Sequence, residues 1–204
     1  EALKNYLVRL GWPHGDQELF DHEEVINKFK EGNINNSPSA FSLEKLSWFN
    51  KEYISKIDSE LLLSQLSNMN TEFSEDEYSL NVLELIRDRC SLMNDFSNES
   101  EYFFKDVDDY DSKAVNKFIN EQAVNLLTEL LAELKSIDAW KSHDIQLSIE
   151  KILSKHEIGF GKIGLPLRIA LTGSTNSPPI DKTVEVLGQK IVFERIEKAI
   201  KVFS

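Results

Sequence analysis

Residues 165–180 read LPLRIALTGSTNSPPI, a stretch in which one helix ends, a polar turn follows and a second helix begins. Pro166 suits the first position of a helix, where its missing N–H costs nothing. Gly173 suits the end of that helix, and Ser177 suits the cap of the next one. Arg168 is turned away from an apolar face formed by Leu167, Ala170 and Leu171. The pattern alone predicts helical-bundle packing around a single arginine.

The bulk composition favours a helical globular protein. The 204 residues are enough for one large or two small domains, and 41% of them are hydrophobic, so a sizeable core can be buried. With only 8 glycines and 5 prolines, long helices are favoured over an all-β fold with many turns. Cys90 is the single cysteine, which excludes an internal disulfide framework and fits a reducing, cytoplasmic compartment. Because the sequence has neither a membrane-length apolar run nor a signal peptide, no membrane partner is expected.

The charge of the chain is unevenly distributed. The formal net charge of −12 argues against a generic nucleic-acid or DNA binder, because neutralising phosphates requires Lys and Arg. Residues 151–204, however, hold 9 Lys and Arg against 5 Asp and Glu, whereas residues 1–150 hold 14 against 30. The basic region is therefore the one that contains residues 165–180, although ordinary solvated surface is the commoner explanation of such an excess.

Apolar residues recur at helical spacing along most of the chain, and polar residues suited to capping mark where helices begin. Capping boxes are predicted at Asp21 with Glu24 and at Ser74 with Glu77, and the longest helix is predicted at about 112–135. Other caps are expected at Ser42, Asp111 and Ser142. The last helix is expected to expose Arg195, Lys198 and Lys201. The predicted fold is all-α: a loop-rich helical module followed by two helical layers or subdomains.

The residue types needed for most catalytic or metal chemistry are not arranged for it. The four histidines (His14, His22, His143 and His156) and Cys90 lack metal-ligand spacing. The sequence also lacks a glycine-rich phosphate loop, a Rossmann fingerprint and a nucleophile elbow. We therefore expect this chain alone to have no catalytic residue, no metal site and no cofactor. It also begins within a helical pattern at Glu1, so we expect it to be a fragment of a longer protein.

Three separated segments resemble the C-terminal half of bacterial-type glutamyl-tRNA synthetases. NYLVRLGWPHGDQELF (5–20) and SPSAFSLEKLSWFNKEYI (37–54) resemble the stem-contact module, with its L-G-W-x-H-G-D-x-E block and its K-L-x-W-x-N-x-x-Y helix. LIRDRCSLMNDF (85–96), followed by YFF, resembles the anticodon-binding helix that ends in R-x-R. Residues 165–200 resemble the closing L-R-x-A-L-T-G segment and the last two helices. The order and the separations agree over essentially the whole chain.

The resemblance implies an organisation and a division of labour. Residues 1–56 would form the stem-contact domain, 57–111 the first helical anticodon-binding subdomain and 112–204 the second, an arrangement called an α-helix cage. The H-I-G-H and K-M-S-K-S motifs of the family's Rossmann catalytic domain do not occur in this sequence. That missing half would bind glutamate, ATP and Mg²⁺ and attach glutamate to tRNA. The implied partner of this chain is tRNA(Glu).

The resemblance also assigns residues to anticodon recognition. Arg89 matches the arginine that distinguishes cytosine from guanine at the third anticodon base, with Arg87 as the alternative. A guanidinium can donate to O2 and N3 of cytosine, whereas guanine presents a donor at its Watson–Crick edge. Four residues in the opening stretch match positions that contact the splayed anticodon bases: Arg168, Ser177, Pro178 and Ile180.

Other positions match the family in part. Lys45 and Trp48 match the helix that faces the tRNA stem at the inner side of the elbow, although simple packing also explains a tryptophan there. Pro179 stands where the family usually has glycine, which would stiffen the anticodon turn. The hypothesis from another class is an acidic, all-helical protein-interaction module that binds no RNA.

Overall fold

The computed structural model describes residues 1–12, 15–29, 34, 39–69 and 72–204. Within these residues the chain forms helices joined by loops and contains no strand, so the predicted all-α fold is confirmed. It divides into two compact units: unit 1 comprises Glu1–Glu75 with Arg87–Asn98, and unit 2 comprises Asp76–Ile86 with Glu99–Ser204. Among the described residues, none of the helices combines the length and the apolar character that a membrane span requires.

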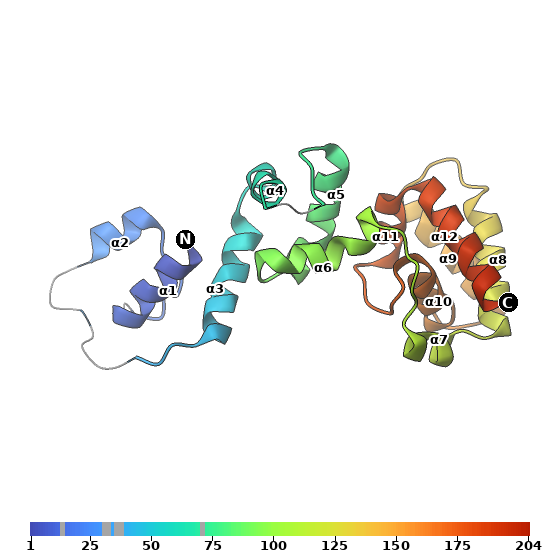
Figure 1. Cartoon of the computed structure of the whole chain (residues 1–204), viewed down its shortest axis with the longest axis horizontal. Coiled ribbons are helices and arrows are strands. Elements are labelled where there is room, and N and C mark those ends of the chain that lie inside the picture. Colours follow the sequence, from blue (N-terminus) through green and yellow to red (C-terminus); the bar gives the residue numbers. More distant parts are fainter. Residues whose placement is uncertain (13–14, 30–33, 35–38, 70–71) are drawn as a thin grey trace. The chain divides into compact units, whose positions relative to one another are not determined.

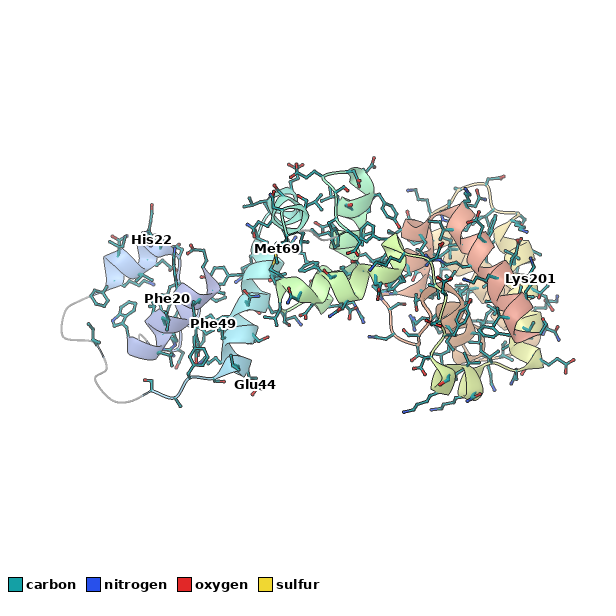
Figure 2. The ribbon with its side chains drawn as sticks, viewed as in Figure 1. Phe20, His22, Glu44, Phe49, Met69 and Lys201 are labelled. Atoms are coloured by element: carbon teal, nitrogen blue, oxygen red, sulfur yellow. The ribbon has the colours of Figure 1, made fainter. Side chains whose placement is uncertain are left out.

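Unit 1 is built around the packing of two helices against each other. Its elements are α1 (Ala2–Gly11), α2 (His22–Lys28), α3 (Leu43–Lys56), α4 (Ser59–Ser67), the short 3₁₀ helix η1 (Arg87–Arg89) and the start of α6 (Met93–Phe104). Tyr6 of α1 and Phe49 of α3 are almost fully buried, with their ring centroids 5.8 Å apart. Figure 2 labels Phe20 and Phe49 among the side chains of this unit. The core therefore fixes α3, the helix that carries Lys45 and Trp48.

A buried polar residue, Asn5, ties the loop after α1 to this core. Its Nδ2 donates to the carbonyl of Glu18 at 2.8 Å, and its Oδ1 accepts from the backbone N–H of Phe20 at 2.8 Å and from the Tyr53 hydroxyl at 2.9 Å. Because unmet buried polar groups are costly, this set of bonds fixes the loop conformation.

Capping explains where several helices begin. The box at Asp21 and Glu24 is confirmed, and Ser42 accepts from the Lys45 N–H at 3.2 Å as predicted. The predicted box at Ser74 and Glu77 is wrong, because α5 (Glu77–Ile86) begins directly after Asp76. The Asp76 carboxylate accepts from the Ser79 backbone N–H at 2.7 Å. Serine and aspartate are both good caps, and the helix begins directly after the aspartate.

Unit 2 is a helical bundle (Figure 1). Besides α5 and the end of α6, it contains α7 (Ser112–Phe118), α8 (Glu121–Leu134), α9 (Ser142–His156), α10 (Gly161–Thr172), α11 (Ile180–Leu187) and α12 (Gln189–Phe203). Helices α8, α10 and α12 pack against one another, and α9 packs on α8 and α11. Fully buried aliphatic side chains fill the space between them, including Leu127, Leu130, Leu134, Ile145 and Ile196.

One predicted helix and one predicted cap in this unit are corrected. The single helix at 112–135 is two helices, because Ile119 has extended backbone and Asn120 caps α8 by accepting from the Ala123 N–H. Ser142 does not cap α9; it is the first helical residue. Its N–H is instead bound by the Glu185 carboxylate of α11 at 2.8 Å, a cap from a distant part of the chain that local sequence cannot reveal.

Helix α10 begins earlier than its proline suggested. Pro166 lies inside the helix, which starts at Gly161 rather than at the proline. A proline in this position leaves the carbonyl of Lys162 without its usual helical donor. Gly164 accommodates the ring of Phe160, because a Cβ there would lie 2.4 Å from Phe160 Cε1.

Arg195 is buried, with 6% of its surface exposed, so its predicted exposure is wrong. Its Nη1 donates to the carbonyls of Tyr102 and Leu171, at 2.7 Å each, and its Nη2 donates to the carbonyl of Lys105 at 2.8 Å. These acceptors lie at the C-terminal ends of α6 and α10, where a cation also meets the negative ends of the helix dipoles. Arg195 therefore joins α12 to both helix ends.

Candidate nucleic-acid interface

The turn after α10 is organised by Arg168. This half-buried side chain donates from Nε to the Ser177 Oγ at 2.7 Å and from Nη2 to the Pro178 carbonyl at 3.2 Å. The Ser177 hydroxyl in turn donates to the Pro178 carbonyl at 3.0 Å. Arg168 thus spans the turn from its N-terminal helix and holds the chain just before α11.

The described structure brings the four opening-stretch residues together, and most of their surface faces inward. Ser177 and Pro178 are buried, and Ile180 is 3% exposed. Ser177 does not cap α11 as predicted; Pro179 occupies the N-cap position and gives no side-chain bond. The Ser177 hydroxyl instead accepts the hydrogen bond from Arg168.

The part of the turn that meets solvent is a short polar edge. Asn176 and Pro179 are exposed, and Ser174 and Thr175 are half-buried. The Ser174 hydroxyl accepts from the Asn176 N–H and donates to the Asn176 carbonyl, both at 3.2 Å. The sequence prediction missed Asn176, although an asparagine in a short Ser- and Thr-rich turn is a usable signal for a polar group held at the surface.

Gly173 packs the start of the turn against the loop before α7. Its φ is +76°, and a Cβ at this position would lie 2.7 Å from the Asp109 carbonyl oxygen. The Asp111 N–H donates to the Gly173 carbonyl at 2.8 Å. Only glycine meets both the positive φ and the close approach without strain, so the predicted helix end at Gly173 is confirmed.

The same loop is held on its other side by a lysine of α12. Lys198 Nζ donates to the Val107 carbonyl at 2.7 Å and pairs with Asp108 at 2.8 Å. The hydrogen bond with Lys198 lowers the pKa of the Asp108 carboxyl, and the same bond raises the pKa of Lys198. The backbone beside Gly173 therefore has a fixed position in unit 2.

In unit 1, Arg87 and Arg89 are the first and last residues of the short helix η1. Arg87 Nε donates to the Ile54 carbonyl at 2.8 Å, Nη1 donates to the Ser59 hydroxyl at 2.9 Å, and Nη2 donates to the Ile57 carbonyl. Arg87 thus binds the C-terminal end of α3 and the start of α4. Arg89 is half-buried at the end of η1, two residues further along.

Lys45 and Trp48 lie on the N-terminal half of α3, also in unit 1. Trp48 is 42% exposed and packs edge-on against Phe49. Lys45 is exposed and pairs with Glu18 at 3.1 Å, and Glu18 also pairs with Arg9 at 3.3 Å. Partial burial raises the pKa of Glu18, but the bonds from Lys45 and Arg9 outweigh it and leave the pKa below its ordinary value.

No group of three or more His, Cys, Asp or Glu side chains among the described residues could hold a metal ion. His14, one of the four histidines considered above, lies outside those residues. Of the predicted positions, Arg89, Lys45 and Trp48 belong to unit 1. The other four, Arg168, Ser177, Pro178 and Ile180, belong to unit 2.

Comparison with known proteins supports the resemblance seen in the sequence. The family model described as "Anticodon binding domain" matches residues 43–200. The chain is similar to a glutamate tRNA ligase from Elizabethkingia meningosepticum CCUG26117, whose crystal structure was determined in complex with its amino acid. The two sequences are 30% identical, and the structures match with a TM-score of 0.92 over 100% of this chain. A glutamate–tRNA synthetase structure from Elizabethkingia anophelis is also 30% identical, with a TM-score of 0.87 over 98% of this chain.

The chain spans 41% and 40% of the lengths of those two proteins, in their C-terminal part. The likeness therefore concerns a portion of each relative and extends over nearly all of this chain. Since the family model covers most of the sequence and the helical architecture agrees with it, the chain belongs to the anticodon-binding domain family.

Proposed function

We propose that this chain is the tRNA-recognition part of a glutamate–tRNA ligase and that it binds tRNA(Glu) through the anticodon and a stem. The observation that carries this proposal is the match of the whole chain to part of two glutamate–tRNA ligases, together with the anticodon-binding family model. Glutamate, ATP and Mg²⁺ would act in the catalytic part of the ligase, whose motifs do not occur in this sequence. The chain alone would be inactive, and its compartment would be the cytoplasm.

The proposed organisation keeps the three boundaries expected from the sequence: 1–56 for stem contact, 57–111 for the first anticodon-binding subdomain and 112–204 for the second. In this proposal α3 approaches the stem. The exposed ring of Trp48 offers an apolar face, and Lys45 offers a cation for phosphate once it leaves Glu18. DNA is not proposed as a partner.

The anticodon would meet the turn after α10. Bases in single-stranded RNA are read by guanidinium groups, backbone groups and apolar platforms. We assign Arg168, Ser177, Pro178 and Ile180 to this site. Because Ser177, Pro178 and Ile180 are buried, their contribution would be the shape of the turn, and the bases would meet its exposed edge at Asn176 and Pro179.

Arg89 would read the third anticodon base. The resemblance to the family favours Arg89 for this role, and Arg87 binds the end of α3 and the start of α4. The Arg89 guanidinium would donate to O2 and N3 of cytosine. It would reject guanine, because guanine presents a donor at its Watson–Crick edge that the guanidinium cannot accept.

Titration of tRNA(Glu) into this chain tests the proposal. The expected result is saturable binding that weakens when the anticodon bases are replaced while the stems are kept. An acidic protein-interaction module would instead show no saturable binding, or binding that is indifferent to the anticodon. Since the isolated chain lacks acceptor-stem contacts, the comparison between the two tRNAs is more informative than the absolute affinity.

A further inference from the structure

The turn that carries Arg89 is attached to α3 by a second side chain besides Arg87. Asn50 lies on α3 two residues after Trp48, and its Nδ2 donates to the Ser91 carbonyl at 2.6 Å. Asn50 is half-buried, so this bond is partly shielded from water. Arg87 and Ser91, which flank Arg89 by two residues on each side, are therefore both bound by groups of α3 or of its C-terminal end.

The same turn is also fixed from the side of α6. The backbone N–H groups of Ser91 and Leu92 both donate to Asp95 Oδ2 at 2.8 Å, and the Cys90 N–H donates to the Arg87 carbonyl at 3.1 Å. The Cys90 side chain is completely buried. The Ser91 residue is thus held at both of its backbone groups, at its N–H by Asp95 and at its carbonyl by Asn50.

These contacts matter because base discrimination depends on the position of the guanidinium. A bidentate contact loses much of its selectivity when its donors shift by about 1 Å. Resting on the proposed function, we infer that Asn50 is a positioning residue for Arg89: its bond to Ser91 fixes the turn so that Arg89 distinguishes cytosine from guanine. Asn50 touches no base in this account, and it acts only through the turn.

Asn50→Asp tests the inference, because the variant keeps the size of the side chain and replaces the donor with an oxygen that repels the Ser91 carbonyl. The quantity measured is the ratio of the dissociation constants of this chain for tRNA with guanine and with cytosine at the third anticodon position. We expect Asn50→Asp to lower this ratio by roughly fivefold or more, as the loss of a base-specific contact would. Asn94→Asp makes the same charge change at an exposed position of α6 in unit 1 and should leave the ratio unchanged.

A double variant separates positioning from general destabilisation. Asn50→Asp should lower the ratio little further in a chain that already carries Arg89→Gln, because both changes act on the same contact. The inference would be overturned if Asn50→Asp weakened the binding of both tRNAs equally. It would also be overturned if Asn50→Asp lowered the ratio as much in the Arg89→Gln chain as in the unsubstituted chain. An unchanged ratio in Arg89→Gln would also overturn it.

Two controls keep these results interpretable. If Asn50→Asp loses its helical circular dichroism, the uncharged variant Asn50→Ala is measured in its place with the same expectation for the ratio. Absence of saturable binding by the unsubstituted chain would count against the proposed function itself. A retained cytosine preference that Arg89→Gln lowers and neither Asn50 variant changes would count against the positioning role alone.

Discussion

Replacing Arg195 with methionine should destabilise unit 2 substantially. Methionine is similar in length and keeps the apolar packing of the arginine stem, but it removes the donors for the carbonyls of Tyr102, Lys105 and Leu171. Burial lowers the pKa of the Arg195 guanidinium, yet an arginine remains charged at ordinary pH. The variant therefore removes a charged, hydrogen-bonded group from the interior.

The magnitude follows from what is left behind. A buried acceptor left without its donor typically costs about 1–3 kcal/mol, and the variant leaves three such carbonyls. Some buried ionic groups can be replaced by apolar residues without loss, but there both partners are removed together. Here the acceptors are backbone carbonyls, which no side-chain substitution removes, so the unsatisfied acceptors persist. We expect a loss of about 4 kcal/mol, a large part of a typical domain stability of about 5–15 kcal/mol.

Urea unfolding followed by circular dichroism measures this loss, with hydrogen exchange of the α10 and α12 amides to report on unit 2 by itself. At a slope of about 2 kcal/mol per molar urea, the midpoint should fall by about 2 M. Lys201→Met removes a positive charge from an exposed position of the same helix and should change stability by less than about 0.5 kcal/mol. A loss below about 1 kcal/mol in Arg195→Met would refute the reasoning, because it would mean that the carbonyls find other donors at little cost.

Two further predictions concern single contacts in unit 2. Gly173→Ala should lower the free energy of unfolding in urea by about 2–4 kcal/mol, because it combines a positive φ with a Cβ placed 2.7 Å from the Asp109 carbonyl oxygen. Gly161→Ala is the control and should show no loss of stability, because its Cβ would meet nothing closer than 3.9 Å. Glu185→Gln should cost about 1 kcal/mol at pH 7. Burial raises the pKa of the Glu185 carboxyl, but the bonds from Ser142 and Lys141 outweigh this effect, so the pKa in the folded chain is lowered. The stabilisation by Glu185 is therefore present above the unfolded pKa of about 4.3 and is lost as the pH falls through the lower folded pKa. The difference in free energy of unfolding between the unsubstituted chain and Glu185→Gln should therefore shrink below about pH 4. A difference that stays constant with pH would contradict the role of the Glu185 carboxylate as a cap for α9.

Much of the fold was predictable because local chemistry decides it. The cap at Ser42 and the helix end at Gly173 depend on a few neighbouring atoms, so their sequence signals are direct. The break between α7 and α8 was equally local, since Asn120 is a good cap, but the continuous apolar pattern across it concealed the signal.

Other features depend on contacts between distant residues. Arg195 lies on the buried face of α12, three residues after Val192 and four before Ala199, and its partners are three carbonyls that are 24 to 93 residues away along the chain. Glu185 caps α9 across 43 residues. No periodicity or spacing encodes such partners, so the sequence alone could not predict them.

The candidate site shows the same division. The resemblance named Arg89 and Arg168, and the structure adds how each is held: Arg168 binds the turn at Ser177, and α3 binds the turn that carries Arg89. Asn50 was visible in the K-L-x-W-x-N-x-x-Y pattern, but its spacing gave no reason to connect it with a loop 41 residues away. Its role could be inferred only once the hydrogen bond was seen.

The central claim is that this chain reads the anticodon of tRNA(Glu), and the base preference of Arg89 tests it most directly. Binding of the chain should favour cytosine over guanine at the third anticodon base, and Arg89→Gln should reduce that preference by about 1–3 kcal/mol. Equal binding of the two tRNAs by the unsubstituted chain would contradict the claim, and a preference that Arg89→Gln leaves intact would contradict the assignment of Arg89.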